Sequence, residues 1–185
     1  NPHPCRDGGI AVGEVTRAVR CGIGGLGKSA RDQHIPEMAA AEGVDLAAVA
    51  SRNASLDGVA NFATLDELLT KAPDIDAVAL CTPPQGRHAQ AAAALKAGKH
   101  VLLEKPPGAT VSELEPLIAV ARQTGRTLFA TWHSRFAPAG EPAKAFLADC
   151  RIKSWVVDWK EEVRGGHPRQ AWIWYPGGFG VLGPG

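Results

Sequence analysis

The sequence lacks two features that would point to large partners: a long apolar run and an excess of charge of one sign. No stretch approaches the length of about 18 apolar residues that a membrane helix needs. Twenty lysines and arginines are balanced by 19 acidic residues, which leaves a net charge of +1. Such a protein has no general attraction for nucleic acid or anionic lipid. We therefore predict no nucleic-acid and no membrane partner, a small-molecule ligand and a cytoplasmic location.

Paired cysteines and metal-binding histidine patterns are also absent. No Cys-x-x-Cys pair occurs among the four cysteines, Cys5, Cys21, Cys81 and Cys150. We expect them to be reduced, buried thiols rather than disulfides or zinc ligands. The six histidines show neither His-x-His nor His-x-x-x-His spacing, so we predict no metal site.

The chain does contain a regular alternation of strand-like and helix-like segments. Strands are predicted at 18–23, 44–50, 75–81, 100–103 and 127–131, and helices at 32–42, 65–71, 87–97 and 112–124. Gly98 suits a left-handed helix cap, and Thr110 with Glu113 forms a capping-box signature. This alternation is typical of an α/β protein with a doubly wound, parallel Rossmann sheet.

The pattern changes after Arg135. A helix is predicted at 138–148 and a strand at 152–162, where apolar and polar side chains alternate. Because a lone strand exposes unpaired edges, we expect the truncated start of an α+β sheet domain. We thus divide the chain into a disordered, Pro- and Gly-rich leader (1–16), a dinucleotide-binding Rossmann domain (17–135) and an incomplete substrate and sheet domain (136–185).

A Gly25-x-Gly27-x-x-Ala30 motif lies between the first strand and its helix, which is the position of the Rossmann fingerprint. Gly25 permits a tight turn, Gly27 lets the backbone approach a pyrophosphate, and Ala30 lets the helix pack close to the sheet. The helix N-terminus then offers free N–H groups to phosphates. We predict that the cofactor is bound by Gly25, Leu26, Gly27, Lys28 and Ser29. The alternative is a glycine-rich turn without a ligand.

The turn after the second strand indicates which nicotinamide cofactor is used. NAD enzymes place an acidic residue there, whereas this chain has Ser51 and Arg52, which can bond to a 2′-phosphate. We therefore predict that the cofactor is NADP, with NAD as the alternative. Ser51 and Arg52 could instead form an ordinary solvated turn that binds no cofactor. Thr82 and Pro83 end the third strand at the edge where ligands of open α/β sheets lie, although the prolines could simply stiffen this loop.

The segment Glu104-Lys105-Pro106, with Ala-Gly-Lys-His-Val at 97–101, resembles the Gfo/Idh/MocA oxidoreductase family. Further segments at 25–34, 130–135, 159–164 and 167–178 are similar to the aldose 1-dehydrogenases of that family. The resemblance covers about 19–185. It implies a Rossmann fold and the oxidation of an aldose at C1 to its lactone by hydride transfer to NADP or NAD.

Lys105 is the candidate catalytic residue. Hydride leaves C1 of a sugar more easily as the hydroxyl loses its proton, so a polar group must take or polarise that proton. Lys105 lies at a strand end beside a proline, and burial near a nicotinamide cation would favour its neutral amine. Glu104 is then expected to orient Lys105 or the cofactor. The alternative is an ordinary surface lysine after a strand.

The resemblance also makes His133, Glu161 and His167 candidates for contacts with sugar hydroxyls, because imidazole and carboxylate both bond to them. Each could instead be structural, with its hydrogen bonds made to backbone or water. Four tryptophans could line a sugar platform or simply pack in a core or an interface, and they are Trp155, Trp159, Trp172 and Trp174.

The sequence departs from the family pattern near its end. Gly183 stands where the resemblance places an aspartate that acts in proton transfer, and the sequence stops at Gly185, before a substrate-binding asparagine. Gly166 and Tyr175 replace a tryptophan and a glutamate. Gly24 replaces a β-branched residue and should weaken its strand by about 0.5–1 kcal/mol.

The resemblance further implies a C-terminal sheet that covers the substrate and builds an oligomer interface. We therefore expect a truncated chain with exposed apolar surface, in which cofactor binding is better supported than turnover, and a homo-oligomer through the sheet domain. Two alternatives stay open. One is a non-catalytic nucleotide-binding or regulatory module, and the other is a fragment with an unrelated activity.

Overall fold

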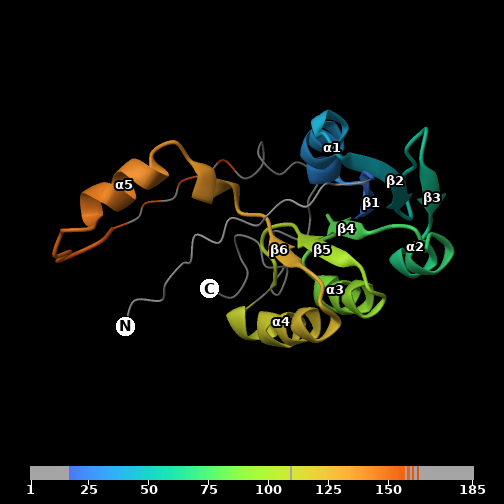
Figure 1. The fold of residues 1–185 in the computed structure, drawn as a ribbon. Coiled ribbons are helices and arrows are strands. Elements are labelled where there is room, and N and C mark those ends of the chain that lie inside the picture. Colours follow the sequence, from blue (N-terminus) through green and yellow to red (C-terminus); the bar gives the residue numbers. More distant parts are fainter. Residues whose placement is uncertain (1–16, 109, 157, 159, 161, 163–185) are drawn as a thin grey trace.

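A six-stranded parallel sheet forms the centre of the computed structural model, which describes residues 17–108, 110–156, 158, 160 and 162 (Figure 1). The strand order is β3-β2-β1-β4-β5-β6. The strands are β1 (Val19–Gly24), β2 (Val44–Ala50), β3 (Ala60–Phe62), β4 (Ala77–Leu80), β5 (His100–Leu103) and β6 (Leu128–Ala130). All neighbouring pairs are parallel, and the order reverses between β1 and β4, which confirms the doubly wound Rossmann sheet.

The helical segments are η1 (Ala30–His34), α1 (Ile35–Ala40), α2 (Leu65–Lys71), α3 (Arg87–Lys96), α4 (Val111–Thr124), η2 (His133–Phe136) and α5 (Gly140–Leu147). Five of them, η1 and α1 to α4, cover the two faces of this sheet, whereas η2 and α5 follow β6 and extend away from it (Figure 1). One core holds side chains of α2, α3 and α4, whereas η1 and α1 pack with a second core on the opposite face. None of these helices is long and apolar enough to cross a membrane.

The structure confirms the two helix caps that the sequence predicts, at Thr110 and Gly98. Thr110 caps α4 by accepting a hydrogen bond from the Glu113 amide at 3.3 Å. Gly98 follows α3 with φ +77°, a conformation that favours glycine. Thr64 caps α2 in the same way by accepting from the Glu67 amide at 3.2 Å.

Gly24 has a packing role that its strand propensity does not reveal. A Cβ atom at this position would lie 3.0 Å from Leu80 Cδ2, and one at Gly22 would lie 3.2 Å from Leu68 Cδ1. These distances are tighter than ordinary van der Waals contact. Close packing of β1 against α2 and β4 therefore accounts for glycine in this strand.

Three expectations differ from the structure. The described residues within 152–162 form no strand, because no neighbouring strand in the described part of the chain pairs with their backbone groups. Strand β3 is missing from the prediction, since Ala60, Asn61 and Phe62 are too few to show an alternation. Among the cysteines, Cys21 is buried and Cys81 half-buried as free thiols, but Cys150 is exposed after α5.

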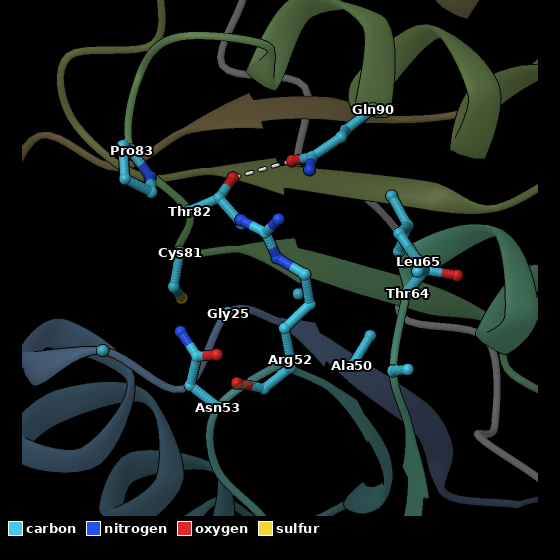
Figure 2. Close-up of a pocket in the computed structure, with 14 residues that line it drawn as sticks. Gly25, Ala50, Arg52, Asn53, Thr64, Leu65, Cys81, Thr82, Pro83 and Gln90 are labelled. Carbon is cyan, nitrogen blue, oxygen red and sulfur yellow. Dashed lines mark hydrogen bonds between the residues drawn. The ribbon is translucent and has the colours of Figure 1, made fainter. Parts of the chain in front are cut away.

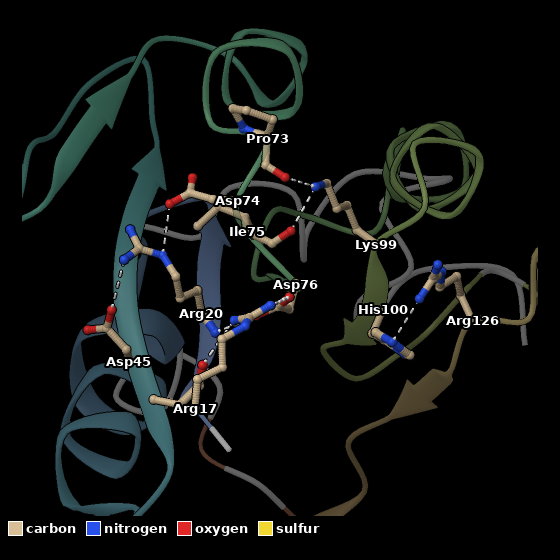
Figure 3. A network of polar contacts seen from close by, with 11 residues as sticks. Arg17, Arg20, Asp45, Pro73, Asp74, Ile75, Asp76, Lys99, His100 and Arg126 are labelled. Atoms are coloured by element: carbon tan, nitrogen blue, oxygen red, sulfur yellow. Dashed lines mark hydrogen bonds and ion pairs between the residues drawn. The ribbon is translucent and has the colours of Figure 1, made fainter. Parts of the chain in front are cut away.

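A polar network joins the ends of the strands opposite the ligand edge (Figure 3). The Asp76 carboxylate accepts two hydrogen bonds from Arg17, both at 2.6 Å, and one from the Arg20 amide at 2.9 Å. The hydrogen bonds from Arg17 lower the pKa of Asp76 to about 2, although its partial burial opposes this. Buried Lys99 donates at 2.7 Å to the carbonyls of Pro73 and Ile75. These bonds join the start of β1, the segment before β4 and the residue before β5.

Candidate functional site

A cavity of about 440 Å³ lies at the carboxyl ends of β1, β2 and β4 (Figure 2). This is where the strand order reverses, the usual ligand position in open α/β sheets. The cavity is lined by Gly24, Gly25, Gly27, Ala50, Ser51, Arg52, Asn53, Ala63, Thr64, Leu65, Cys81, Thr82, Pro83 and Gln90. Six of the predicted cofactor residues therefore meet around one space: Gly25, Gly27, Ser51, Arg52, Thr82 and Pro83.

The glycine turn after β1 approaches the end of β4 very closely. Gly25 has φ +91°, and a Cβ there would lie 3.0 Å from both the amide nitrogen and Cγ2 of Thr82. Its own amide donates to the Ala50 carbonyl at 2.8 Å. Gly27 is exposed, with no atom within 4 Å of the position of a Cβ. One glycine is thus required by the fold, while the other leaves its backbone open to a ligand.

The remaining residues of the motif have other surroundings. Leu26 is buried in the second core, so only its backbone is available to a ligand. Lys28 is exposed and forms an ion pair with Asp32. Helical structure runs continuously over 28–40, four residues earlier than the predicted start, and Ser29 lies half-buried in its first turn. The N-terminal dipole of this helix therefore lies beside the cavity.

The turn after β2 supplies the polar wall of the cavity. The Ser51 amide continues the pairing with β3 by donating to the Phe62 carbonyl at 2.9 Å. The Arg52 side chain extends into the cavity, as Figure 2 shows. Among the described residues that line this space none is acidic, so nothing there repels a phosphate. On the opposite wall the Thr82 hydroxyl donates to Gln90 Oε1 at 2.7 Å.

Glu104 is a buried carboxylate at the end of β5. Its Oε1 lies 2.7 Å from His34 Nε2, and its Oε2 accepts from the Lys105 amide at 3.0 Å. Burial raises the pKa of the Glu104 carboxyl, but the hydrogen bond and charge of His34 and those of Lys105 outweigh it, so the pKa is lowered. Glu104 is therefore ionised near neutral pH.

A buried arginine ties the loops after β4 and β5 together. Arg87, at the start of α3, is almost completely buried. Its guanidinium donates to the Thr82 carbonyl, with Nε at 3.1 Å, and to the carbonyl of Pro106 at 2.5 Å. It also donates to the Glu104 carbonyl. The backbones on both sides of the candidate catalytic residue are thus fixed by one side chain.

Lys105 lies in the loop after β5, at the same edge of the sheet as the cavity, and its peptide bond to Pro106 is cis. We expected burial to favour the neutral amine of Lys105. Within the described residues, however, the Lys105 side chain is exposed. The cause is its place in an open loop, since the neighbouring Glu104 takes the inward position.

The candidate sugar contacts are only partly placed by the structure. His133 begins η2, which follows the carboxyl end of β6, so its backbone lies on the ligand edge of the sheet. Glu161, His167 and Gly183 lie outside the described residues, as do the predicted leader and the tryptophans at 159, 172 and 174. Trp155 is described and is exposed rather than packed in a core.

The sequence analysis did not identify His34 and Arg87, which contact the loops of the site, or the cavity-lining residues Asn53 and Gln90. His34 could have been found, because its spacing of four from Ala30 and from Met38 places all three on the buried face of the helix. No local pattern distinguishes Arg87 from a solvated arginine at a helix start. Its role depends on loops that come together only in the folded sheet.

These features fit a dinucleotide. The glycine turn admits no side chain at Gly25, the backbone at Gly27 is open, and the Arg52 cation lies within the cavity. A pyrophosphate needs backbone N–H groups at a helix N-terminus, and a nucleotide phosphate needs a cation, so both requirements are met.

Comparisons with known proteins agree with this geometry. Galactose 1-dehydrogenase of Pseudomonas fluorescens is 45% identical over 167 residues, which are 90% of this chain and 54% of that protein. 1,5-Anhydro-D-fructose reductase of Ensifer adhaerens is 35% identical over 99 residues, or 54% of this chain and 30% of that protein. The crystal structure of D-galactose-1-dehydrogenase from Rhizobium etli has a TM-score of 0.79 and 53% identity, covering 87% of this chain and 52% of that one.

The chain thus spans about half the length of the galactose 1-dehydrogenases that it matches. Residues 19–131 match the sequence profile of an oxidoreductase family with an NAD-binding Rossmann fold. This match covers the whole parallel sheet and the loops that form the site, including Glu104 and Lys105. The chain therefore belongs to the Gfo/Idh/MocA oxidoreductase family, whose Rossmann fold binds a nicotinamide dinucleotide.

Proposed function

We propose that this protein oxidises an aldose at C1 to the lactone, with NADP as the preferred hydride acceptor and NAD as the alternative. The observation that carries the proposal is the position of Lys105, exposed at the carboxyl end of β5 on the same sheet edge as the dinucleotide cavity. The similarity to galactose 1-dehydrogenase supports the substrate class. D-Galactose and L-arabinose are therefore the first sugars to test.

The cofactor would be held by the residues around the cavity. The glycine turn and the start of its helix, Gly25 to Ser29, would bind the pyrophosphate through backbone N–H groups. Ser51 and Arg52 would bind a 2′-phosphate, and this assignment is what favours NADP. Thr82 and Pro83 would form the opposite wall, after β4, the strand that pairs with β5.

Lys105 would take or polarise the proton of the C1 hydroxyl as the C1–H bond breaks. When bound, the nicotinamide supplies the acceptor for the hydride. Glu104 fixes the backbone of Lys105 through the amide hydrogen bond, so the amine is presented from a rigid loop. The exposure of Lys105 leaves its amine accessible to a substrate.

The other parts of the interpretation belong to the same proposal. Residues 17–135 would form the cofactor domain and 136–185 the beginning of a substrate domain, with His133, Glu161 and His167 binding sugar hydroxyls. Large exposed apolar side chains on β6, η2 and α5 support a covering sheet or an oligomer interface: Phe129, Phe136 and Phe146. Cytoplasmic location remains a prediction.

A non-catalytic nucleotide-binding module is the second candidate. The glycine at 183, where the family resemblance places a proton-transfer aspartate, favours it. The retained Lys105 and its buried partner Glu104 favour the enzyme.

A titration with NADP and NAD followed by an aldose panel tests the proposal. We expect NADPH formation with D-galactose, L-arabinose or D-glucose, and a loss of about 100-fold or more in kcat for Lys105→Ala with nucleotide affinity retained. Lys96→Ala, at an exposed position near the end of α3, serves as the control. Tight nucleotide binding without turnover would support the module, and full activity of Lys105→Ala would refute the assigned role.

A further inference from the structure

His34 and Glu104 form a buried pair that connects two separate parts of the site. Their side chains are 12% and 8% exposed, and the residues are 70 positions apart in the sequence. His34 ends the π-helical turn η1, seven residues after Gly27 in the nucleotide-binding motif. Glu104 immediately precedes Lys105. The contact therefore runs from the helix beside the cavity to the candidate catalytic loop.

The direction of the hydrogen bond follows from the charge of Glu104. An ionised carboxylate can only accept hydrogen bonds, so His34 Nε2 must donate across the distance of 2.7 Å. The π-helical turn η1 affects the direction of the His34 side chain. Such a turn has one residue more than an α-helical turn, which rotates the following side chains about the helix axis. Such turns within α-helices are frequent at functional sites.

Glu104 is held at each of its polar groups. Its amide donates to the Leu80 carbonyl at 3.2 Å, and its carbonyl accepts from Arg87. These bonds fix the backbone but leave the side chain free to rotate. Within the described part of the chain, two contacts orient the carboxylate: His34 on Oε1 and the Lys105 amide on Oε2. Loss of the first contact would release the second.

We propose that His34 is a positioning residue, which holds the Lys105 loop through the Glu104 carboxylate and thereby couples the nucleotide-binding helix to that loop. The inference rests on the proposed function for its consequence in catalysis. The contact itself is independent of any substrate. His34 is not expected to touch the sugar or the cofactor.

Amide hydrogen exchange of Lys105 in the full chain tests the coupling without turnover. His34→Ala should make the Lys105 amide exchange about ten-fold faster, because its carboxylate acceptor is no longer held. His34→Gln, which retains a donor at similar reach, should stay close to wild type. The side chain of His34→Asn is too short to reach Glu104, so this variant should exchange as fast as His34→Ala. If His34→Ala does not fold, His34→Asn is compared with His34→Gln instead. His88→Ala, an exposed histidine on α3, is the control.

Kinetics then test the consequence for Lys105. His34→Ala should lower kcat about 10- to 100-fold with little change in nucleotide affinity, and His34→Gln should recover most of it. In the plot of kcat against pH, the acid limb of His34→Ala should move to higher pH. The reason is that the pKa of Glu104 rises when the His34 donor is lost. The other titratable or charged groups that act on this carboxyl are Lys105, Arg87 and Cys81, and all are retained in these variants.

Unchanged exchange of the Lys105 amide in both His34→Ala and His34→Asn would overturn the inference. So would a glutamine variant as impaired as the alanine variant. A wild-type protein that oxidises no aldose would instead refute the proposed function. The exchange result is read separately from turnover, so the two failures can be distinguished.

Discussion

Arg52 is the residue on which the proposed preference for NADP rests. It follows β2, extends into the cavity and has no acidic neighbour among the described lining residues. Arg52→Asp should reverse the preference from NADP to NAD, because a carboxylate repels a 2′-phosphate and accepts from ribose hydroxyls. Loss of a charge-assisted hydrogen bond is worth about 1.5–3 kcal/mol, so the NADP affinity should fall about 10- to 100-fold. Calorimetric titration with both nucleotides measures this, and an unchanged preference would refute the assignment.

Gly25 is the residue at which backbone conformation and close packing coincide. Gly25→Ala should lower the free energy of unfolding by about 1–3 kcal/mol, since the added Cβ meets Thr82 in a left-handed backbone conformation. It should also abolish nucleotide binding. Gly43→Ala is the matched control, with φ +76° but no atom within 4 Å of its Cβ position. Urea unfolding measures both variants, and equal effects would show that contact with Thr82 is unimportant.

At the scale of elements, the site depends on two loops that different strands supply. The loop after β4 carries Thr82, the loop after β5 carries Lys105, and Arg87 from α3 donates to both. An ammonium group could not span these carbonyls as the planar guanidinium does. The geometry of the edge is thus determined by one helix start as well as by the strands.

Removal of this arginine should loosen both loops together. Arg87→Met should lower the free energy of unfolding by about 1–3 kcal/mol, because carbonyls of Thr82, Glu104 and Pro106 lose their donor. Arg87→Lys should retain only part of the stability that Arg87 provides. Thermal unfolding measures the change, and Arg122→Met at an exposed site on α4 is the control. A methionine variant as stable as wild type would contradict this role.

At the scale of the whole molecule, the two edges of the sheet have separate roles. The carboxyl edge holds the cavity and the Lys105 loop, whereas the opposite edge is joined by the Asp76 network. Substitutions at Asp76 should therefore affect stability and leave nucleotide affinity unchanged.

The Asp76 network predicts a specific pH dependence of stability. Its pKa is about 2 in the folded protein against an ordinary value of 3.8, so the unfolded chain binds the proton more readily. The contribution is present above about pH 4 and is lost as the pH falls toward 2. Solvent screening reduces it to about 1 kcal/mol. Asp76→Asn should remove this difference between pH 5 and pH 2.5 in urea unfolding, whereas exposed Asp57→Asn should keep it. Identical profiles for wild type and Asp76→Asn would contradict the prediction.

The sequence by itself determined the features that short segments encode. Apolar runs and caps predicted the bounds of β2, α2 and β5 correctly, and the spacing of Gly25 and Gly27 predicted the turn beside the cavity. These features depend on residues within a few positions of one another. Local propensity and periodicity are sufficient for them.

Only the tertiary structure decided how distant segments meet. It paired His34 with Glu104, buried Arg87 between two loops and left Lys105 exposed. It also showed that the described residues within 152–162 have no strand neighbour in the described part of the chain. Contacts across 70 residues depend on the order of strands in the sheet, and no periodicity along the chain carries that information.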